Sequence, residues 1–180
     1  MVWALTDLAI GGGPIAFSLP IEQFVCDPIP IPSVWPQVCV VDFDLTRFAV
    51  VWGAWNRTTD TLYVTDSYLA PLSDLAIHAE AVRKRGSWIP ILMDMEGHGR
   101  SHEAGWRIVQ RLADLGLDVY TVPLDLEAGV AEVAARISVC QMKVFSTLDG
   151  WLGHYRQYRR NEKLDLVEQD VTSCAPQRFL

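Results

Sequence analysis

The sequence contains no long apolar run, no secretory leader pattern and no nucleotide-binding glycine motif. Its 180 residues are 50% hydrophobic. No uninterrupted apolar stretch approaches the roughly 18 residues that a membrane-spanning helix needs, and the N-terminus lacks the charged-then-apolar pattern of a signal peptide. The glycine run Gly11-Gly12-Gly13 is not followed by the GK[ST] ending of a phosphate-binding loop. We therefore expect a protein that is neither secreted nor in contact with a membrane.

Closely spaced cysteines are also absent. The four cysteines, Cys26, Cys39, Cys140 and Cys174, are scattered and form no CxxC pair, which argues against a zinc ribbon. Cys39 lies inside an apolar run, where a free thiol acts as a small hydrophobic group. This cysteine usage predicts a reducing, cytosolic compartment.

Positive charge is in deficit, because the formal net charge is −7. A protein that coats nucleic acid through its overall charge is therefore not expected. An enzyme that holds DNA with a local basic patch remains compatible with this charge, and an acidic metal pocket would itself contribute to it.

The chain does have apolar segments that end in carboxylates. The run 38–41 leads into Asp42 and Asp44, and the run 89–93 leads into Asp94 and Glu96. Carboxylates from different strand ends, brought to one place, form an oxygen-rich pocket suited to hard divalent cations. Both pairs also have a simpler interpretation as turn residues, since Asp favours turns.

The order of apolar patterns predicts a mixed α/β domain. We expect three antiparallel strands, a helix, and then strands alternating with helices, at 38–42, 48–56, 61–69, 74–85, 88–94, 102–115, 118–122, 127–140, 151–160 and 164–167. Ser73 is the expected N-cap of the first helix, and the tryptophans at 52, 55, 88, 106 and 151 are expected in the core. This order is similar to that of the RNase H-like fold, a central five-stranded mixed sheet flanked by helices.

A proline-rich segment precedes these elements. Five prolines lie between residues 20 and 36, and they favour extended backbone. We expect residues 1–36 to be a linker or lead-in and residues 37–180 to form the folded domain.

Several of these segments, in this order, resemble the nuclease domain of the large terminase subunit of tailed phages. The matching segments are Val41-Asp42-Phe43, Trp88-Ile89-Pro90 leading to Glu96-Gly97, Lys143-Val144-Phe145, and Trp151 followed by Tyr155-Arg156-Gln157-Tyr158-Arg159-Arg160. The proline-rich lead-in resembles the connection from the ATPase domain of that family. Without a Walker A lysine, the ATP-driven half of such a protein is expected outside this chain.

The resemblance implies three metal-binding carboxylates, Asp42, Glu96 and Asp170. Asp42 would bridge two Mg²⁺ or Mn²⁺ ions, Glu96 would hold one, and Asp170 would close the site from the C-terminal segment. Asp94 is the alternative second ligand and Glu168 the alternative third. Cys174 stands where many members of the family have a later Asp, and Pro176 would interrupt a helix there.

The resemblance also implies a function. It predicts endonucleolytic cleavage of concatemeric double-stranded DNA during genome packaging in the host bacterial cytoplasm, with an ATPase domain, a small terminase subunit and a portal as partners. Arg156, Arg159 and Arg160, with Tyr155 and Tyr158, are candidate DNA contacts. The alternatives are a catalytically impaired prophage remnant or assembly module with the same fold, and another RNase H-like nuclease such as a junction resolvase.

Overall fold

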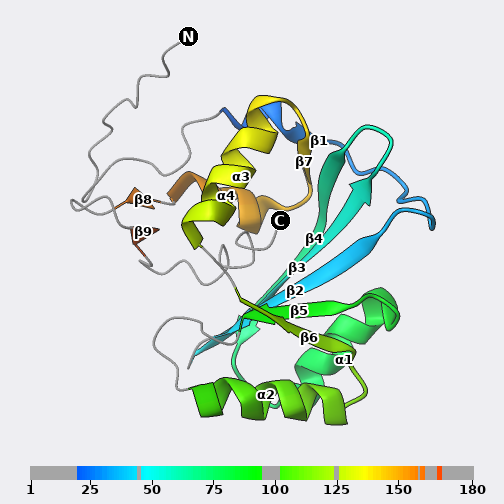
Figure 1. The fold of residues 1–180 in the computed structure, drawn as a ribbon, viewed down its shortest axis with the longest axis vertical. Helices are drawn as coiled ribbons and strands as arrows, with labels where there is room; N and C mark the ends of the chain where they lie inside the picture. The colour runs from blue at the N-terminus through cyan, green and yellow to red at the C-terminus, as the bar shows by residue number, and fades with distance from the viewer. Residues whose placement is uncertain are drawn as a thin grey trace.

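A computed structural model describes residues 20–43, 46–94, 102–123, 126–157, 159–160 and 166–167. The elements in these residues are η1 (Ile21–Gln23), β1 (Val25–Cys26), β2 (Gln37–Phe43), β3 (Arg47–Asn56), β4 (Thr61–Pro71), α1 (Leu75–Gly86), β5 (Ile91–Asp94), α2 (His102–Asp114), β6 (Val119–Val122), α3 (Leu126–Ser138), β7 (Met142–Phe145), α4 (Asp149–Gln157), β8 (Arg159–Arg160) and β9 (Leu166–Val167). Helices lie on both faces of one sheet (Figure 1). None of the helices in these residues is long and apolar enough to span a membrane.

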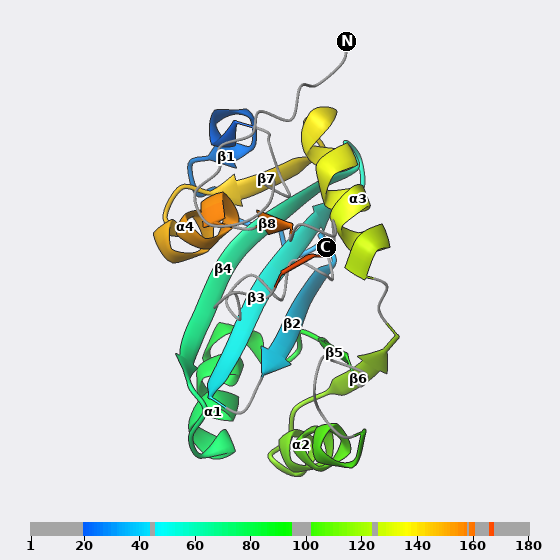
Figure 2. The same ribbon diagram turned by 90° about the vertical axis from the view of Figure 1, so that its left-hand side faces the viewer.

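The sheet has seven strands in the order β1-β7-β4-β3-β2-β5-β6. Strands β2, β3 and β4 pair antiparallel through consecutive hairpins and lie side by side in Figure 2, while β5 runs parallel to β2, and β6 to β5. These five strands are the mixed sheet predicted from the sequence. The prediction missed two short strands, β1 and β7, which extend the sheet beyond β4 in parallel pairing.

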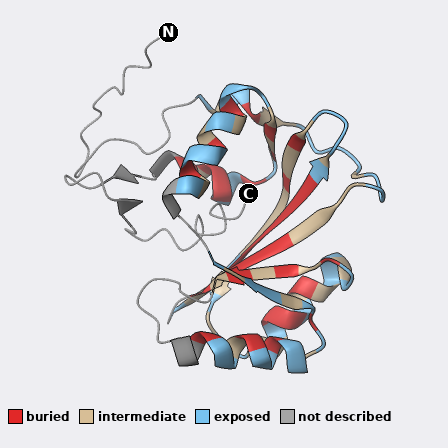
Figure 3. Cartoon of the chain, viewed as in Figure 1, coloured by how far each residue is buried: buried red, intermediate tan, exposed pale blue. Residues whose placement is uncertain are grey.

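The two faces of the sheet carry separate apolar cores. On one face, alternate residues of β2 and β5, including Val41 and Met93, pack against residues of α1 and α2. On the other face, Val51 and Val144 pack with residues of α3 and α4. Figure 3 shows the buried residues concentrated along the sheet and on the helix sides that face it. Because successive strand residues point to opposite faces, strands β3 and β4 contribute to both layers.

The lead-in segment takes part in this packing. Strand β1 pairs in parallel with β7, and Phe24 is completely buried, with its ring centroid 4.9 Å from that of Tyr155. Trp35 also packs against Tyr63 of β4, at 5.3 Å between ring centroids. Residues 20–36 therefore take part in the packing of the domain, whereas the predicted domain boundary at residues 36 and 37 stays a prediction.

Several helix and strand boundaries differ from the sequence prediction. Asp74, rather than Ser73, caps α1, because its carboxylate accepts a hydrogen bond from the backbone N–H of Ala76 at 2.9 Å. Helix α4 ends at Gln157, and the arginines at 159 and 160 pair with β9 instead of continuing a helix. The predicted strand 88–94 begins only at Ile91, after Pro90, which has no N–H to donate to a ladder.

Only two of the five tryptophans predicted in the core are buried. Trp52 and Trp151 are 3% and 2% exposed, whereas Trp88 and Trp106 are 62% and 54% exposed. Trp55 lies at the end of β3, where its indole N–H donates to Asp60 and the guanidinium of Arg57 covers its ring. A tryptophan ring at a strand end can be satisfied by such polar partners at the surface, which composition alone does not reveal.

Candidate metal centre

Asp42 lies near the carboxyl end of β2, an interior strand of the sheet. Its neighbours Val41 and Phe43 are buried in the core beneath α1 and α2. Strand alternation therefore directs the half-buried Asp42 to the opposite face, the one that carries α3 and α4. Asp42 pairs with Ala49 across the β2–β3 hairpin, so a small residue flanks it on that side.

Asp94 is the last residue of β5, the parallel neighbour of β2. The register between these strands sets Val41 opposite Met93, and Asp42 and Asp94 are the next residues along each strand. Met93 is buried in the same core as Val41, and Asp94 therefore points to the same face as Asp42. Both carboxylates are half-buried and both interact with other groups in the chain.

The remaining predicted ligands lie outside the described residues. This applies to Glu96 and Asp170, and also to Asp44 and Glu168. Within the described part of the chain, no group of three His, Cys, Asp or Glu side chains gathers into a metal site. The roles of these residues stay predictions, and the structure adds that Asp42 and Asp94 each follow the paired residues Val41 and Met93.

The donor set at the two strand ends fits a hard divalent cation. Asp42 and Asp94 offer only carboxylate oxygens, the ligands that Mg²⁺ and Mn²⁺ prefer. Strand β2 has β3 and β5 as neighbours, and β5 has β2 and β6, so both acids lie on interior strands. Backbone pairing on both sides restricts their movement, which favours a preorganised site.

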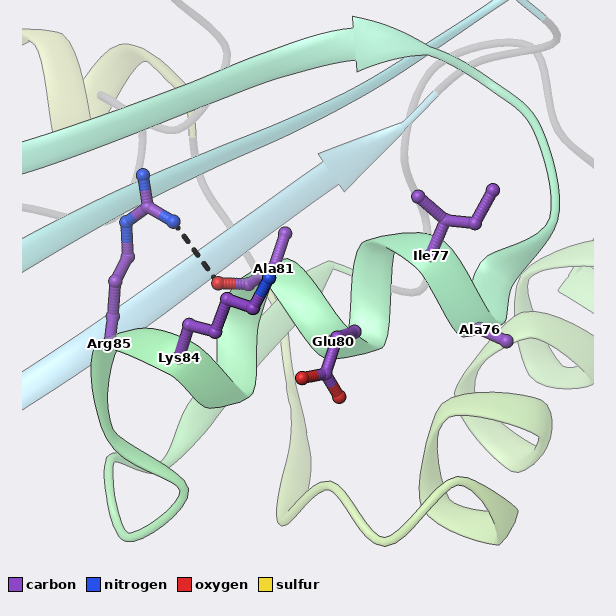
Figure 4. Close-up of a pocket in the computed structure, with 6 residues that line it drawn as sticks. All are labelled: Ala76, Ile77, Glu80, Ala81, Lys84 and Arg85. Carbon is purple, nitrogen blue, oxygen red and sulfur yellow. Dashed lines mark hydrogen bonds between the residues drawn. The ribbon is translucent and has the colours of Figure 1, made fainter.

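A surface hollow exists elsewhere on the molecule, on α1. It has a volume of about 490 Å³ and is lined by Ala76, Ile77, Glu80, Ala81, Lys84 and Arg85 (Figure 4). Helix α1 packs on the sheet face opposite to Asp42 and Asp94. The hollow is therefore separate from the paired carboxylates.

One predicted DNA contact is wrong. Tyr155 is 2% exposed and stacks on Trp151 in the core between the sheet and α4, at 5.8 Å between ring centroids. Desolvation by burial raises the pKa of its hydroxyl above the ordinary value. A tyrosine in an arginine-rich run suggested a stacking surface, but helical periodicity brings this ring to the buried side of α4.

No protein-family model matches the chain. Two curated proteins match in sequence, the large terminase subunits of Enterobacteria phage LP7 and Salmonella phage P22, each 24% identical over 169 residues and 88% of this chain. The matches cover 35% and 33% of those two proteins, so the chain spans about a third of their length.

Solved structures extend the likeness to the fold. The nuclease domain of the P22 large terminase has a TM-score of 0.85 at 20% identity, covering 93% of this chain and 90% of that one. This chain has the fold of a phage large-terminase nuclease domain. The family resemblance and the RNase H-like fold class predicted from the sequence are confirmed.

Two other terminase nuclease structures carry metal ions. The nuclease domain of the bacteriophage SPP1 large terminase, with bound Mn, has a TM-score of 0.63 at 14% identity and covers 88% of this chain and 95% of that one. The large terminase nuclease of thermophilic phage G20c, with bound magnesium, has a TM-score of 0.63 at 13% identity and covers 94% and 97%. In the terminase nuclease fold of this chain, the paired acids occupy the carboxyl ends of β2 and β5.

Proposed function

We propose that this chain is the metal-dependent endonuclease domain of a phage large terminase. It cleaves concatemeric double-stranded DNA during genome packaging, in the cytoplasm of a bacterial host. The observation that carries the proposal is the parallel register of β2 with β5, in which Asp42 and Asp94 directly follow the paired residues Val41 and Met93 and point to the same sheet face. The metal-bearing relatives with the same fold support it.

The acids have distinct roles in this proposal. Asp42, on the interior strand β2, and Asp94, on the neighbouring strand β5, would hold the Mg²⁺ or Mn²⁺ ions. Glu96, the sequence prediction for the second ligand, and Asp170, the prediction for the third, remain candidates to complete the site. Divalent ions bound there would activate a water nucleophile and stabilise the leaving oxygen of the phosphodiester.

The two strands contribute position rather than reactivity. The acids lie on adjacent parallel strands, so their carboxylates are brought together before metal or DNA arrives. A half-buried carboxylate pair is poorly screened by solvent, and its mutual repulsion is relieved by bound cations.

Cleavage of supercoiled plasmid in Mn²⁺ tests the proposal. We expect Asp42→Asn and Asp94→Asn each to lower the nicking rate at least about 100-fold, because each removes a metal ligand. Glu96→Gln and Asp170→Asn, measured in the same assay, show whether these two acids are also needed for cleavage. Asp114→Asn, an exposed carboxylate on α2, is the matched control and should cleave at the wild-type rate.

Each alternative gives a different result. Unchanged activity of the Asp42→Asn variant would contradict the metal-site proposal. A wild-type chain that binds no Mn²⁺ and cuts no DNA would indicate a remnant or assembly module. Selective cutting of four-way junctions over linear duplex would indicate a resolvase.

The proposed partners follow from the relatives and not from this fold. The matched proteins are whole large terminase subunits, of which this chain spans about a third. We propose that it works with an ATPase domain, a small terminase subunit and a portal. With a net charge of −7, the chain alone is expected to bind DNA weakly.

A further inference from the structure

Arg47 is the first residue of β3, at the same end of the sheet as Asp42 and Asp94. It lies two residues before Ala49, which pairs with Asp42. Phe48, between them, is buried in the core beneath α1 and α2. Strand alternation therefore places Arg47 on the face of the sheet that carries the two acids.

Arg47 differs in charge from its neighbours on this face of the sheet. On that face of β2, β3, β5 and β6, the described strand residues include Asp42 and Asp94, and Arg47 is the one basic residue among them. The two-residue step from Ala49 to Arg47 covers roughly 7 Å along the strand. A cation at that distance lies beside the acid pair and is displaced along β3 toward the first residue of that strand.

We propose that Arg47 binds a phosphate of the DNA strand that lies over the Asp42–Asp94 pair. This inference rests on the proposed function. The planar guanidinium donates two parallel N–H bonds to phosphate oxygens, which fixes the strand's position as well as attracting it. Because Arg47 lies to one side of the acids, the phosphate it binds is a neighbour of the one that is cleaved.

Arg47 also has a possible structural role that must be separated from DNA binding. Its side chain is half-buried and interacts with other groups within the chain. If that were its sole role, removing it would lower stability without changing how the protein responds to salt when it binds DNA. The structural role and the phosphate-binding role therefore predict different results for the salt dependence of DNA binding.

The test is the salt dependence of binding to a short duplex, measured with the full chain in Ca²⁺. Calcium accepts the same oxygen ligands as Mg²⁺ with longer and more flexible bonds. We expect Arg47→Ala to reduce the slope of log K against log[salt] by about 0.9, the value for one phosphate contact. Arg47→Lys should restore the slope, because a point charge is retained.

Arg57→Ala is the matched control. Arg57 is exposed and lies just past the other end of the ten-residue strand β3, roughly 30 Å from Arg47. It should leave the slope at the wild-type value. In Mn²⁺, Arg47→Ala should also lower kcat/KM for plasmid nicking at least about tenfold, with Arg47→Lys intermediate.

These arms separate the two proposals. Equal slopes for Arg47→Ala and Arg57→Ala, or a lower melting temperature for Arg47→Ala with no change in slope, would overturn the phosphate contact and leave the nuclease proposal standing. If Arg47→Ala lowers the slope but the wild-type chain cuts no DNA in Mn²⁺, the phosphate contact would be supported and the nuclease proposal contradicted.

Discussion

At the scale of single residues, His78 shows how the core accommodates a polar ring. It is 1% exposed and stacks on Phe48 at 4.4 Å between ring centroids. Its Nε2 accepts a hydrogen bond from the backbone N–H of Ser73 at 3.3 Å, so in the neutral ring the proton is on Nδ1, 3.0 Å from the Tyr68 hydroxyl.

This arrangement predicts a pH-dependent stability. Burial lowers the pKa of His78 below its ordinary value, and the nearby Asp74 carboxylate offsets this only in part. Below about pH 6.5 the unfolded chain takes up a proton at this residue before the folded chain does. The contribution of His78 to the free energy of unfolding should therefore be complete above that pH and decrease as the pH falls.

Urea unfolding of the wild type and His78→Gln, at several values between pH 8 and pH 5, measures this contribution. The difference in free energy of unfolding between the two should be largest at high pH and should shrink as the pH is lowered. Carboxylates common to both chains cancel in the difference. A difference that is the same at every pH would show that His78 does not titrate as described.

At the scale of secondary-structure elements, the short strand β1 ties the lead-in segment to the sheet. The backbone N–H groups of Val144 and Ser146 donate to the carbonyls of Phe24 and Cys26, both at 2.8 Å. Phe24 is buried among residues of β7 and α4. Two backbone bonds and one aromatic ring thus fix a segment whose prolines suggested a linker.

Removal of this ring should be costly. We expect Phe24→Ala to lower the free energy of unfolding by about 3–5 kcal/mol, the usual range for a buried Phe truncated to Ala. Val34→Ala, in the same segment but at a side chain 84% exposed, should change it by less than about 0.5 kcal/mol.

Chemical denaturation of both variants provides the comparison. Phe24→Leu, which keeps most of the apolar volume, should lose clearly less than Phe24→Ala. Equal stability of Phe24→Ala and Val34→Ala would mean that the lead-in does not stabilise the domain.

The elements that were predictable share a strong local signal. Strands β2 and β3 are long apolar runs, β4 mixes apolar and polar residues between polar turns, and α2 has a regular inward stripe containing Val109 and Leu112. Strands β1 and β7 have two and four residues, too few to show a period, and they depend on partners far away in the sequence. The formation of these two strands depends on pairing with residues far away in the sequence, and no local sequence pattern predicts that pairing.

The same limit applies to the candidate site. The acid at the end of the run 38–41 was apparent from its contrast with the apolar residues before it. Glu96 was the predicted second ligand and Asp94 its alternative, because residues two apart in a strand face the same way. The pairing of β2 with β5 places Asp94 one residue beyond Met93, the partner of Val41, whereas Glu96 lies outside the described residues.

At the scale of the whole molecule, the fold brings together acids that are far apart in the chain. The antiparallel half of the sheet presents Asp42, and the parallel half presents Asp94 beside it. Helices on both faces cover the apolar residues of the strands, and the acids at the ends of β2 and β5 directly follow such buried residues. The central claim is that these two carboxylates share divalent metal.

Diffraction from a crystal soaked in Mn²⁺ tests that claim most directly. The account predicts anomalous density for manganese at roughly 2.0–2.4 Å from carboxylate oxygens of both Asp42 and Asp94, distances typical of oxygen-bound divalent ions. A soaked Asp42→Asn crystal should lose that density. Density bound to other residues, or none beside this pair in the wild type, would contradict the account.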